Sequence, residues 1–204
     1  MPSQMMTSII SRDELSSLIL ENVYIKNASS NKKKDQSSLS YLIERDLSQS
    51  DCIKLGNGVE KLLQDLISKH SVGICNIKPK NSKGAKEKDH LFCDEEKKII
   101  YYAELKANIN LDTEKSKSTY MKCLDIVKDL KTNYPGYEIK WCLLGYRYIN
   151  YSDIPPIIQK KYSAIGANLF GINQYLSLLN VNLQFSEAMY KTFLNEIADA
   201  MFSD

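Results

Sequence analysis

The spacing of hydrophobic residues changes near residue 70, and this change separates predicted helices from predicted strands. Residues 11–27 carry Leu15, Leu18, Ile19 and Val23 at the spacing of one helix face. Residues 38–47 predict a second, shorter helix. Residues 57–69 predict a third helix, with Asn57 as its N-cap and an apolar stripe formed by Val59, Leu62, Leu63, Leu66 and Ile67.

Short apolar runs after this point are typical of strands. Residues 71–78 have apolar side chains on both sides, which predicts a strand covered on both faces. Residues 89–93 and 98–109 predict two further strands, separated by the polar turn 94–97. The second of these strands is rich in Ile and Tyr and apolar on both faces at first, so we expect it to be central in a sheet.

The rest of the chain returns mostly to helical spacing. Asp112 or Thr113 begins a helix that is expected to run to about Lys131. Its predicted buried side consists of Met121, Leu124, Val127 and Leu130. The segment 138–148 follows a Pro-Gly turn and predicts a strand. Three more helices are expected at 155–162, 172–179 and 186–202. The pattern indicates an α/β protein with a small mixed sheet flanked by helices, and with extra helices at both termini.

Composition narrows the class of protein. The chain has 204 residues, 43% of them hydrophobic and 25% charged, which suits one globular domain. Neither a bilayer-spanning run nor a secretion signal is expected, so we predict no membrane association. Five widely spaced cysteines indicate reduced thiols and a cytoplasmic protein of prokaryotic type. Only two histidines are present, which disfavours zinc hydrolases.

The net charge says little about binding partners, whereas the distribution of charge along the chain says more. The net charge is +2, which neither requires nor excludes a nucleic-acid partner. The segments 26–36 and 78–88 are basic and contain Ser or Gly. They are interpreted either as solvated loops or as contacts to a phosphate backbone, in which case Lys83 and Lys86 are candidates.

The end of the predicted central strand places a carboxylate and an ammonium on one face. Glu104 and Lys106 are two residues apart, so on a strand they point the same way. Asp89 begins the neighbouring strand of the predicted hairpin, and the turn brings it beside Glu104. Two carboxylates with a lysine form a hard oxygen site, which suits Mg²⁺. Because buried charges are costly unless they pair or function, this group is the main candidate for chemistry.

Asp89, followed after fourteen residues by Glu104-Leu105-Lys106, resembles the PD-(D/E)xK nuclease motif. The order helix, three strands, helix, strand over residues 56–148 is similar to the common core of that superfamily, the restriction-endonuclease-like fold. Glu60 is similar to the acid that many members carry on the leading helix. Lys88 stands where the motif often has proline. Size and motif surroundings are most similar to a type II restriction endonuclease.

This resemblance implies a metal-dependent mechanism. Asp89 and Glu104 are expected to hold Mg²⁺, for which Mn²⁺ can substitute, and the metal would activate a water on a DNA phosphodiester. Lys106 would orient that water or stabilise charge on the phosphate. Glu60 is either a further metal ligand or an exposed charge on an amphipathic helix, and the sequence leaves both interpretations open.

A structural alternative to this site is a salt-bridged sheet edge, with Lys88 and Lys106 neutralising the two acids. Acid-x-Lys triplets are common in a chain rich in Glu and Lys. Four others occur, at residues 95–97, 96–98, 129–131 and 138–140. None of them ends an apolar strand beside a strand that carries an acid, and this difference favours Glu104-x-Lys106.

Further candidates surround this site in the sequence. His90 follows Asp89 but points to the other face, so we expect a structural role. Lys115, Lys117 and Lys122, near the start of the helix after the catalytic strand, are candidates for phosphate contact. Arg147 and Asn150, among tyrosines after the last strand, are candidates for reading base edges.

The leading hypothesis is a sequence-specific endonuclease for double-stranded DNA. Cutting both strands of a palindrome requires two active sites, so a homodimer is expected. The terminal helices 11–27 and 186–202 are its candidate surfaces. The chain is interpreted as a single domain with an N-terminal helical extension (1–55), a catalytic core (56–148) and a C-terminal extension (149–204). The alternatives are a junction resolvase or repair nuclease, or a non-catalytic DNA-binding or assembly protein.

Overall fold

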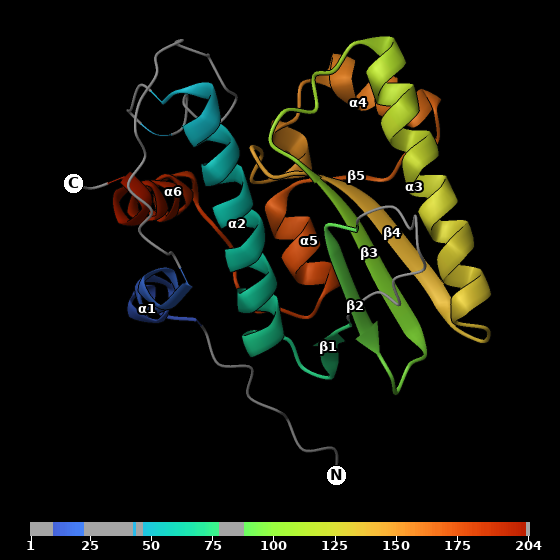
Figure 1. The fold of residues 1–204 in the computed structure, drawn as a ribbon, viewed down its shortest axis with the longest axis horizontal. Helices are drawn as coiled ribbons and strands as arrows, with labels where there is room; N and C mark the ends of the chain where they lie inside the picture. The colour runs from blue at the N-terminus through green and yellow to red at the C-terminus, as the bar shows by residue number, and fades with distance from the viewer. Residues whose placement is uncertain (1–9, 23–42, 44–46, 78–87, 203–204) are drawn as a thin grey trace.

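The computed structural model describes residues 10–22, 43, 47–77 and 88–202. The elements in these residues are α1 (Arg12–Asn22), α2 (Gln49–His70), β1 (Ile74–Asn76), β2 (His90–Asp94), β3 (Ile99–Lys106), α3 (Thr113–Asn133), β4 (Glu138–Gly145), the 3₁₀-helix η1 (Tyr151–Asp153), α4 (Pro156–Ala164), β5 (Leu169–Phe170), α5 (Ile172–Leu178) and α6 (Glu187–Phe202) (Figure 1). The predicted α/β class is confirmed, and so is the order helix, three strands, helix, strand. None of the helices described is long and apolar enough to cross a lipid bilayer.

The five strands form one mixed sheet in the order β1-β2-β3-β4-β5. The β1–β2 and β2–β3 pairs are antiparallel, whereas β3–β4 and β4–β5 are parallel. The expected hairpin is therefore β2–β3, with His90 opposite Ala103. β3 is the central strand, as predicted.

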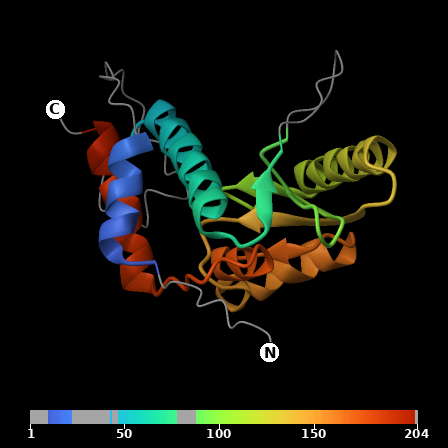
Figure 2. The same cartoon turned by 90° about the horizontal axis from the view of Figure 1, so that it is seen from below.

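Helices cover both faces of this sheet. Ile100 and Tyr102 point to a core shared with α3, while Tyr101, Ala103 and Leu105 point to a core shared with α2, α5 and α6. Figure 2 shows α3 on one side of the sheet and α5 on the other. Every residue of β3 except the last is buried, because a central strand with helices on both sides has no solvent-facing surface.

The first core helix begins earlier than predicted. α2 begins at Gln49, and Ser48 is its N-cap, with the Ser48 hydroxyl accepting a hydrogen bond from the Asp51 amide at 3.1 Å. The prediction of Asn57 as N-cap was wrong. Gly56 and Gly58, on either side of Asn57, both lie inside the helix where other side chains pack closely.

Two predictions of buried surface were also wrong. β1 is a short edge strand, and both Cys75 within it and Val72 before it are exposed. In α3, Met121 is 48% exposed, and the buried side consists of Ser116, Cys123, Ile126, Val127 and Leu130. The helix is thus rotated from the predicted orientation. The two-residue strand β5 was not predicted, since it is too short to show periodicity. The expected helix 38–47 lies mainly outside the described residues, and Leu47, which is described, is not helical.

The terminal helices pack within the chain. α1 lies beside α6, on the outer side of α2 (Figure 2). The apolar residues of α1 (Leu15, Leu18, Ile19) and those of α6 (Tyr190, Phe193, Leu194, Ile197, Ala198) are buried. The apolar stripes that suggested a dimer surface are therefore covered by this chain's own helices, and they no longer argue for one.

The close contact between α2 and the segment after β4 generates a stability prediction. A Cβ at Gly56 would lie 2.8 Å from the Tyr146 hydroxyl, which sits on a rigid ring, whereas one at Gly58 would meet the flexible end of Met201 at 3.0 Å. Alanine is favoured over glycine inside a helix by about 1 kcal/mol. We therefore expect Gly58→Ala to be neutral or stabilising, and Gly56→Ala to destabilise by about 1–3 kcal/mol through overpacking.

Urea denaturation of the two variants measures this difference. Adding Tyr146→Phe to Gly56→Ala removes the obstructing oxygen and should recover part of the loss. Equal stability of the two single variants would contradict the proposed contact.

Candidate active site

Glu104 lies near the carboxyl end of β3 and is almost completely buried, with 1% of its surface exposed. One carboxylate oxygen, Oε1, forms an ion pair with Lys106 Nζ at 2.8 Å. The other, Oε2, accepts a hydrogen bond from the Tyr102 hydroxyl at 2.9 Å. All three residues lie on the same face of β3 because they are two residues apart. The prediction that Glu104 and Lys106 share one face of the strand is confirmed, and their ion pair is the contact that the salt-bridge alternative expected.

A second ammonium group reaches the same carboxylate from α3. Lys122 Nζ lies 2.9 Å from Glu104 Oε1 and 2.8 Å from Oε2. The sequence had suggested Lys122 only as one of three lysines for phosphate contact, and not as a partner of Glu104. The sequence shows only that Lys122 lies on the helix that follows β3. It does not show which face of that helix points toward Glu104, because the apolar spacing did not define the rotation of the helix.

Asp89 lies immediately before β2, at the position that continues the strand beside Glu104. Its Oδ2 accepts a hydrogen bond from the Leu105 amide at 2.7 Å. The carboxylate thus takes the place of a strand carbonyl at the end of the hairpin. The expectation that the hairpin brings Asp89, Glu104 and Lys106 together at one end is confirmed.

Burial and neighbouring charges shift the pKa values of these groups. Burial raises the pKa of Asp89, and the charge of Glu104 raises it further, despite the Leu105 amide and two lysines. Burial acts to raise the pKa of Glu104 too, but hydrogen bonds from Lys106 and Lys122 outweigh it, and the net pKa is lowered. Burial acts to lower the pKa of Lys106, but Glu104, Asp89 and Glu60 outweigh it, and the net pKa is raised. The neighbouring carboxylates therefore favour the charged form of Lys106.

His90, at the start of β2, contacts two helices behind the site, α2 and α5. Its Nε2 lies 2.9 Å from the Glu60 carbonyl oxygen, and its Nδ1 lies 2.8 Å from the Tyr175 hydroxyl. Because a carbonyl can only accept, Nε2 carries the proton and Nδ1 accepts from Tyr175. His90 thus ties β2 to α2 and α5, which confirms the structural role expected from the sequence.

Glu60 lies on α2, partly buried, and its charge acts on both Lys106 and Tyr146. Tyr146 is itself buried, and its pKa is raised first by burial and then by the charges of Glu60 and Asp89. The backbone of Glu60 is held by His90, the neighbour of Asp89. These relations place Glu60 on the side of the site opposite α3.

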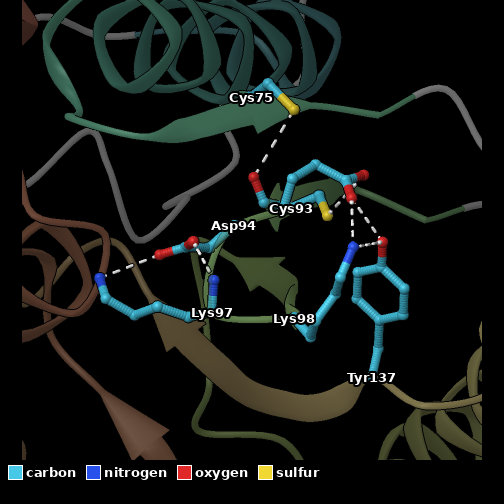
Figure 3. A network of polar contacts seen from close by, with 7 residues as sticks. Cys75, Cys93, Asp94, Lys97, Lys98 and Tyr137 are labelled. Carbon is cyan, nitrogen blue, oxygen red and sulfur yellow. Dashed lines mark hydrogen bonds and ion pairs between the residues drawn. The ribbon is translucent and has the colours of Figure 1, made fainter.

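The other acid-x-Lys triplets lie elsewhere. Residues 95–98 form the tight turn of the β2–β3 hairpin, where Lys97 pairs with Asp94 at 3.0 Å and Lys98 pairs with Glu95 at 3.3 Å (Figure 3). Tyr137 and Cys93 also donate to Glu95. These contacts stabilise a turn at the far end of the strands from Asp89, which agrees with the interpretation of these triplets as structural.

The candidates for DNA contact are dispersed. Lys115 and Lys117 are exposed on the first turns of α3, but Asp112 already caps that helix by accepting from the Lys115 amide at 2.8 Å. The expected attraction of phosphate by the helix start is thus opposed by a fixed carboxylate. Lys83 and Lys86 lie outside the described residues.

Arg147 and Asn150 follow β4 and are partly buried. The amide group of Asn150 donates to Asp153 at 3.2 Å, and its oxygen accepts from Asn173 at 3.0 Å. Asn150 would have to leave both bonds to read a base. Arg147 lies over the Tyr148 ring at 5.9 Å. Their roles in DNA recognition stay predictions.

The donor chemistry of the site fits Mg²⁺. Asp89 and Glu104 supply hard carboxylate oxygens, and burial together with the charge of Glu104 raises the pKa of Asp89, an effect that a bound divalent cation would oppose. Among the residues that the structure describes, no three His, Cys, Asp or Glu side chains are grouped to hold a metal. Water and phosphate oxygens would complete the coordination, as is usual for Mg²⁺.

No protein-family model, no curated protein and no solved structure matches the chain. The interpretation of the site therefore depends on its own geometry and chemistry.

The environment of His90 predicts how stability depends on pH. Burial lowers the pKa of His90 to about 4, although the bond to the Glu60 carbonyl acts against it. In the unfolded chain the His90 imidazole becomes protonated near pH 6.5, whereas in the native protein it stays neutral until about pH 4. We therefore expect His90 to make the free energy of unfolding fall by about 1.4 kcal/mol per pH unit as the pH drops through this window.

Urea denaturation between pH 4.5 and 7 measures this slope. In His90→Gln the contribution should disappear, so the curve of the variant should be flatter than that of the parent protein. His70→Gln is the matched control, because His70 is the only other histidine. Parallel curves for His90→Gln and the parent protein would show that the native ring is not held neutral.

Proposed function

We propose that the protein is a Mg²⁺-dependent, sequence-specific endonuclease for double-stranded DNA, of the type II restriction kind, with a restriction-endonuclease-like core. The observation that carries this proposal is the convergence of Asp89, Glu104 and Lys106 at one end of the β2–β3 hairpin. Two carboxylates and a lysine in this arrangement are the chemical parts of metal-assisted phosphodiester hydrolysis.

The position of the group supports a catalytic role. Glu104 and Lys106 end β3, and β4 runs parallel beside it, with Glu104 opposite Leu143 and Lys106 opposite Gly145. In open α/β sheets, ligands bind beyond the carboxyl ends of the strands. The acid and the lysine lie at that end of the sheet.

The burial of the charges argues against a purely structural salt bridge. Glu104 is on the central strand, so it does not lie at an exposed sheet edge. Replacing a buried ion pair with apolar residues is often neutral or stabilising. Functional sites often contain such an arrangement: Glu104 is a buried carboxylate, and burial raises the pKa of the neighbouring Asp89.

Each residue of the site would have its own role in the reaction. Asp89 and Glu104 would hold the Mg²⁺ ion, or Mn²⁺ in its place, which would polarise the scissile phosphate and lower the pKa of a bound water. Lys106, protonated at neutral pH, would stabilise negative charge on the phosphate. Glu60 acts on Lys106 through its charge and is the candidate for a further contact to metal-bound water.

Cutting both strands of a duplex still requires two sites, so we propose a homodimer. Its surface is not supplied by the apolar stripes of α1 and α6, which are buried within the chain.

Cleavage of plasmid DNA tests the proposal directly. With Mg²⁺ present, the protein should produce discrete fragments, and EDTA should abolish them. Glu104→Ala and Asp89→Ala should each reduce the rate by about a hundredfold or more, because the metal and its charge stabilisation are lost. Glu138→Ala is the matched control: Glu138 begins the acid-x-Lys triplet at residues 138–140, but it lies exposed at the start of β4.

The outcomes separate the candidate functions. Cleavage of branched DNA alone would indicate a junction resolvase or repair nuclease with the same core. DNA binding without cleavage in Mg²⁺ or Mn²⁺ would contradict both enzymes and leave a DNA-binding or assembly protein. Full activity of Glu104→Ala would show that the cutting belongs to a different site.

A further inference from the structure

The carboxylate of Glu104 has two lysine partners, and they differ in origin. Lys106 lies on the same strand and contacts one oxygen, while Lys122 reaches over from α3 and contacts both. The charge of Asp89 also acts on Lys106 and Lys122, but Glu104 is the carboxylate that both ammonium groups contact.

The position of Lys122 allows movement. It lies between Met121, which is exposed, and Cys123, which is buried, and about a third of its side chain (32%) is exposed. A lysine side chain is long and flexible, and its ammonium group is strongly hydrated. Lys122 can thus exchange the Glu104 carboxylate for an anion that approaches from solvent, while its backbone stays in the helix.

The ammonium of Lys122 also occupies the place that a cation would take. It sits at hydrogen-bond distance from both oxygens of Glu104, the carboxylate that the proposed function assigns to Mg²⁺. A Mg²⁺ ion that bound both oxygens would need the space that the Lys122 ammonium fills, and it would be repelled by the charge of that group.

We propose that Lys122 is a positioning residue that holds the cation site of Glu104 until a nucleic-acid phosphate takes up its ammonium group. This inference rests on the proposed function, because it assumes that Glu104 binds a divalent cation and that the ligand is DNA. It assigns Lys122 to the phosphate backbone in the bound state, whereas Lys106 remains with the reacting phosphate.

A thermodynamic consequence follows from this competition. Bound DNA draws Lys122 away from Glu104 and so strengthens Mg²⁺ binding. By linkage, Mg²⁺ strengthens DNA binding by the same factor. The protein without DNA holds Mg²⁺ weakly, so the cation site is completed only on the substrate.

Calorimetric titration of Mg²⁺ into the protein without DNA tests the first half of the proposal. Lys122→Gln removes the charge but keeps a hydrogen-bond donor for the buried Glu104, so it should bind Mg²⁺ about tenfold more tightly. Lys122→Arg keeps the charge and should bind Mg²⁺ like the parent protein. Lys128→Gln, at an exposed position of the same helix, is the matched control.

Binding of a DNA duplex in EDTA tests the second half. Lys122→Gln should weaken duplex binding and reduce the slope of log K against log salt by about one, the loss of one phosphate contact. Opposite effects on Mg²⁺ and DNA affinity distinguish this role from a structural one, since a disturbed site would weaken both. Thermal unfolding of each variant confirms that it is folded, and Lys122→Met replaces any Lys122→Gln protein that is not.

Failure of this inference differs from failure of the proposed function. If the parent protein binds Mg²⁺ and cuts DNA but Lys122→Gln leaves Mg²⁺ affinity unchanged, the inference alone is overturned. If the parent protein neither binds Mg²⁺ nor cuts DNA, the proposed function falls and the inference falls with it.

Discussion

The buried carboxylate of Glu104 imposes the constraint on which the surrounding structure depends. A carboxylate without solvent costs several kcal/mol in desolvation unless donors replace the lost water. Here the donors come from Tyr102 and Lys106 on its own strand and from Lys122 on α3. The helix must therefore lie across the end of the strand with Lys122 turned inward, and this orientation leaves Met121 exposed to solvent.

The opposite face is held by a neutral histidine. His90 and Asp89 are consecutive, so their side chains point to opposite faces of the sheet. His90 binds the backbone of α2 and the Tyr175 hydroxyl on α5, while Asp89 binds the end of β3. The start of β2 thus connects α2 and α5 to the end of β3, and it sets the position of Glu60 relative to Asp89. This rigidity is what a constellation of reacting groups requires.

The argument for function rests on the geometry and chemistry of the site. A fold supports many chemistries, and an α/β sheet with helices on both faces does not by itself indicate a nuclease. The discriminating facts are local: two acids and a lysine meet at the carboxyl end of the central strand, and the pKa of Asp89 is raised. In the hairpin turn, by contrast, the lysines of the acid-x-Lys triplets pair with acids three residues before them and stabilise the turn (Figure 3).

The sequence by itself determined the order of the core elements, the central place of β3 and the pairing of Asp89 with Glu104, because strand periodicity and hairpin register are local properties. It did not determine the start of α2, since Ser48 and not Asn57 caps the helix, and the glycines beside Asn57 pack against Tyr146 and Met201. Nor did it determine the rotation of α3, because several apolar stripes were available. Only tertiary packing chose among them, and that choice brought Lys122 onto Glu104 and buried the terminal helices against each other.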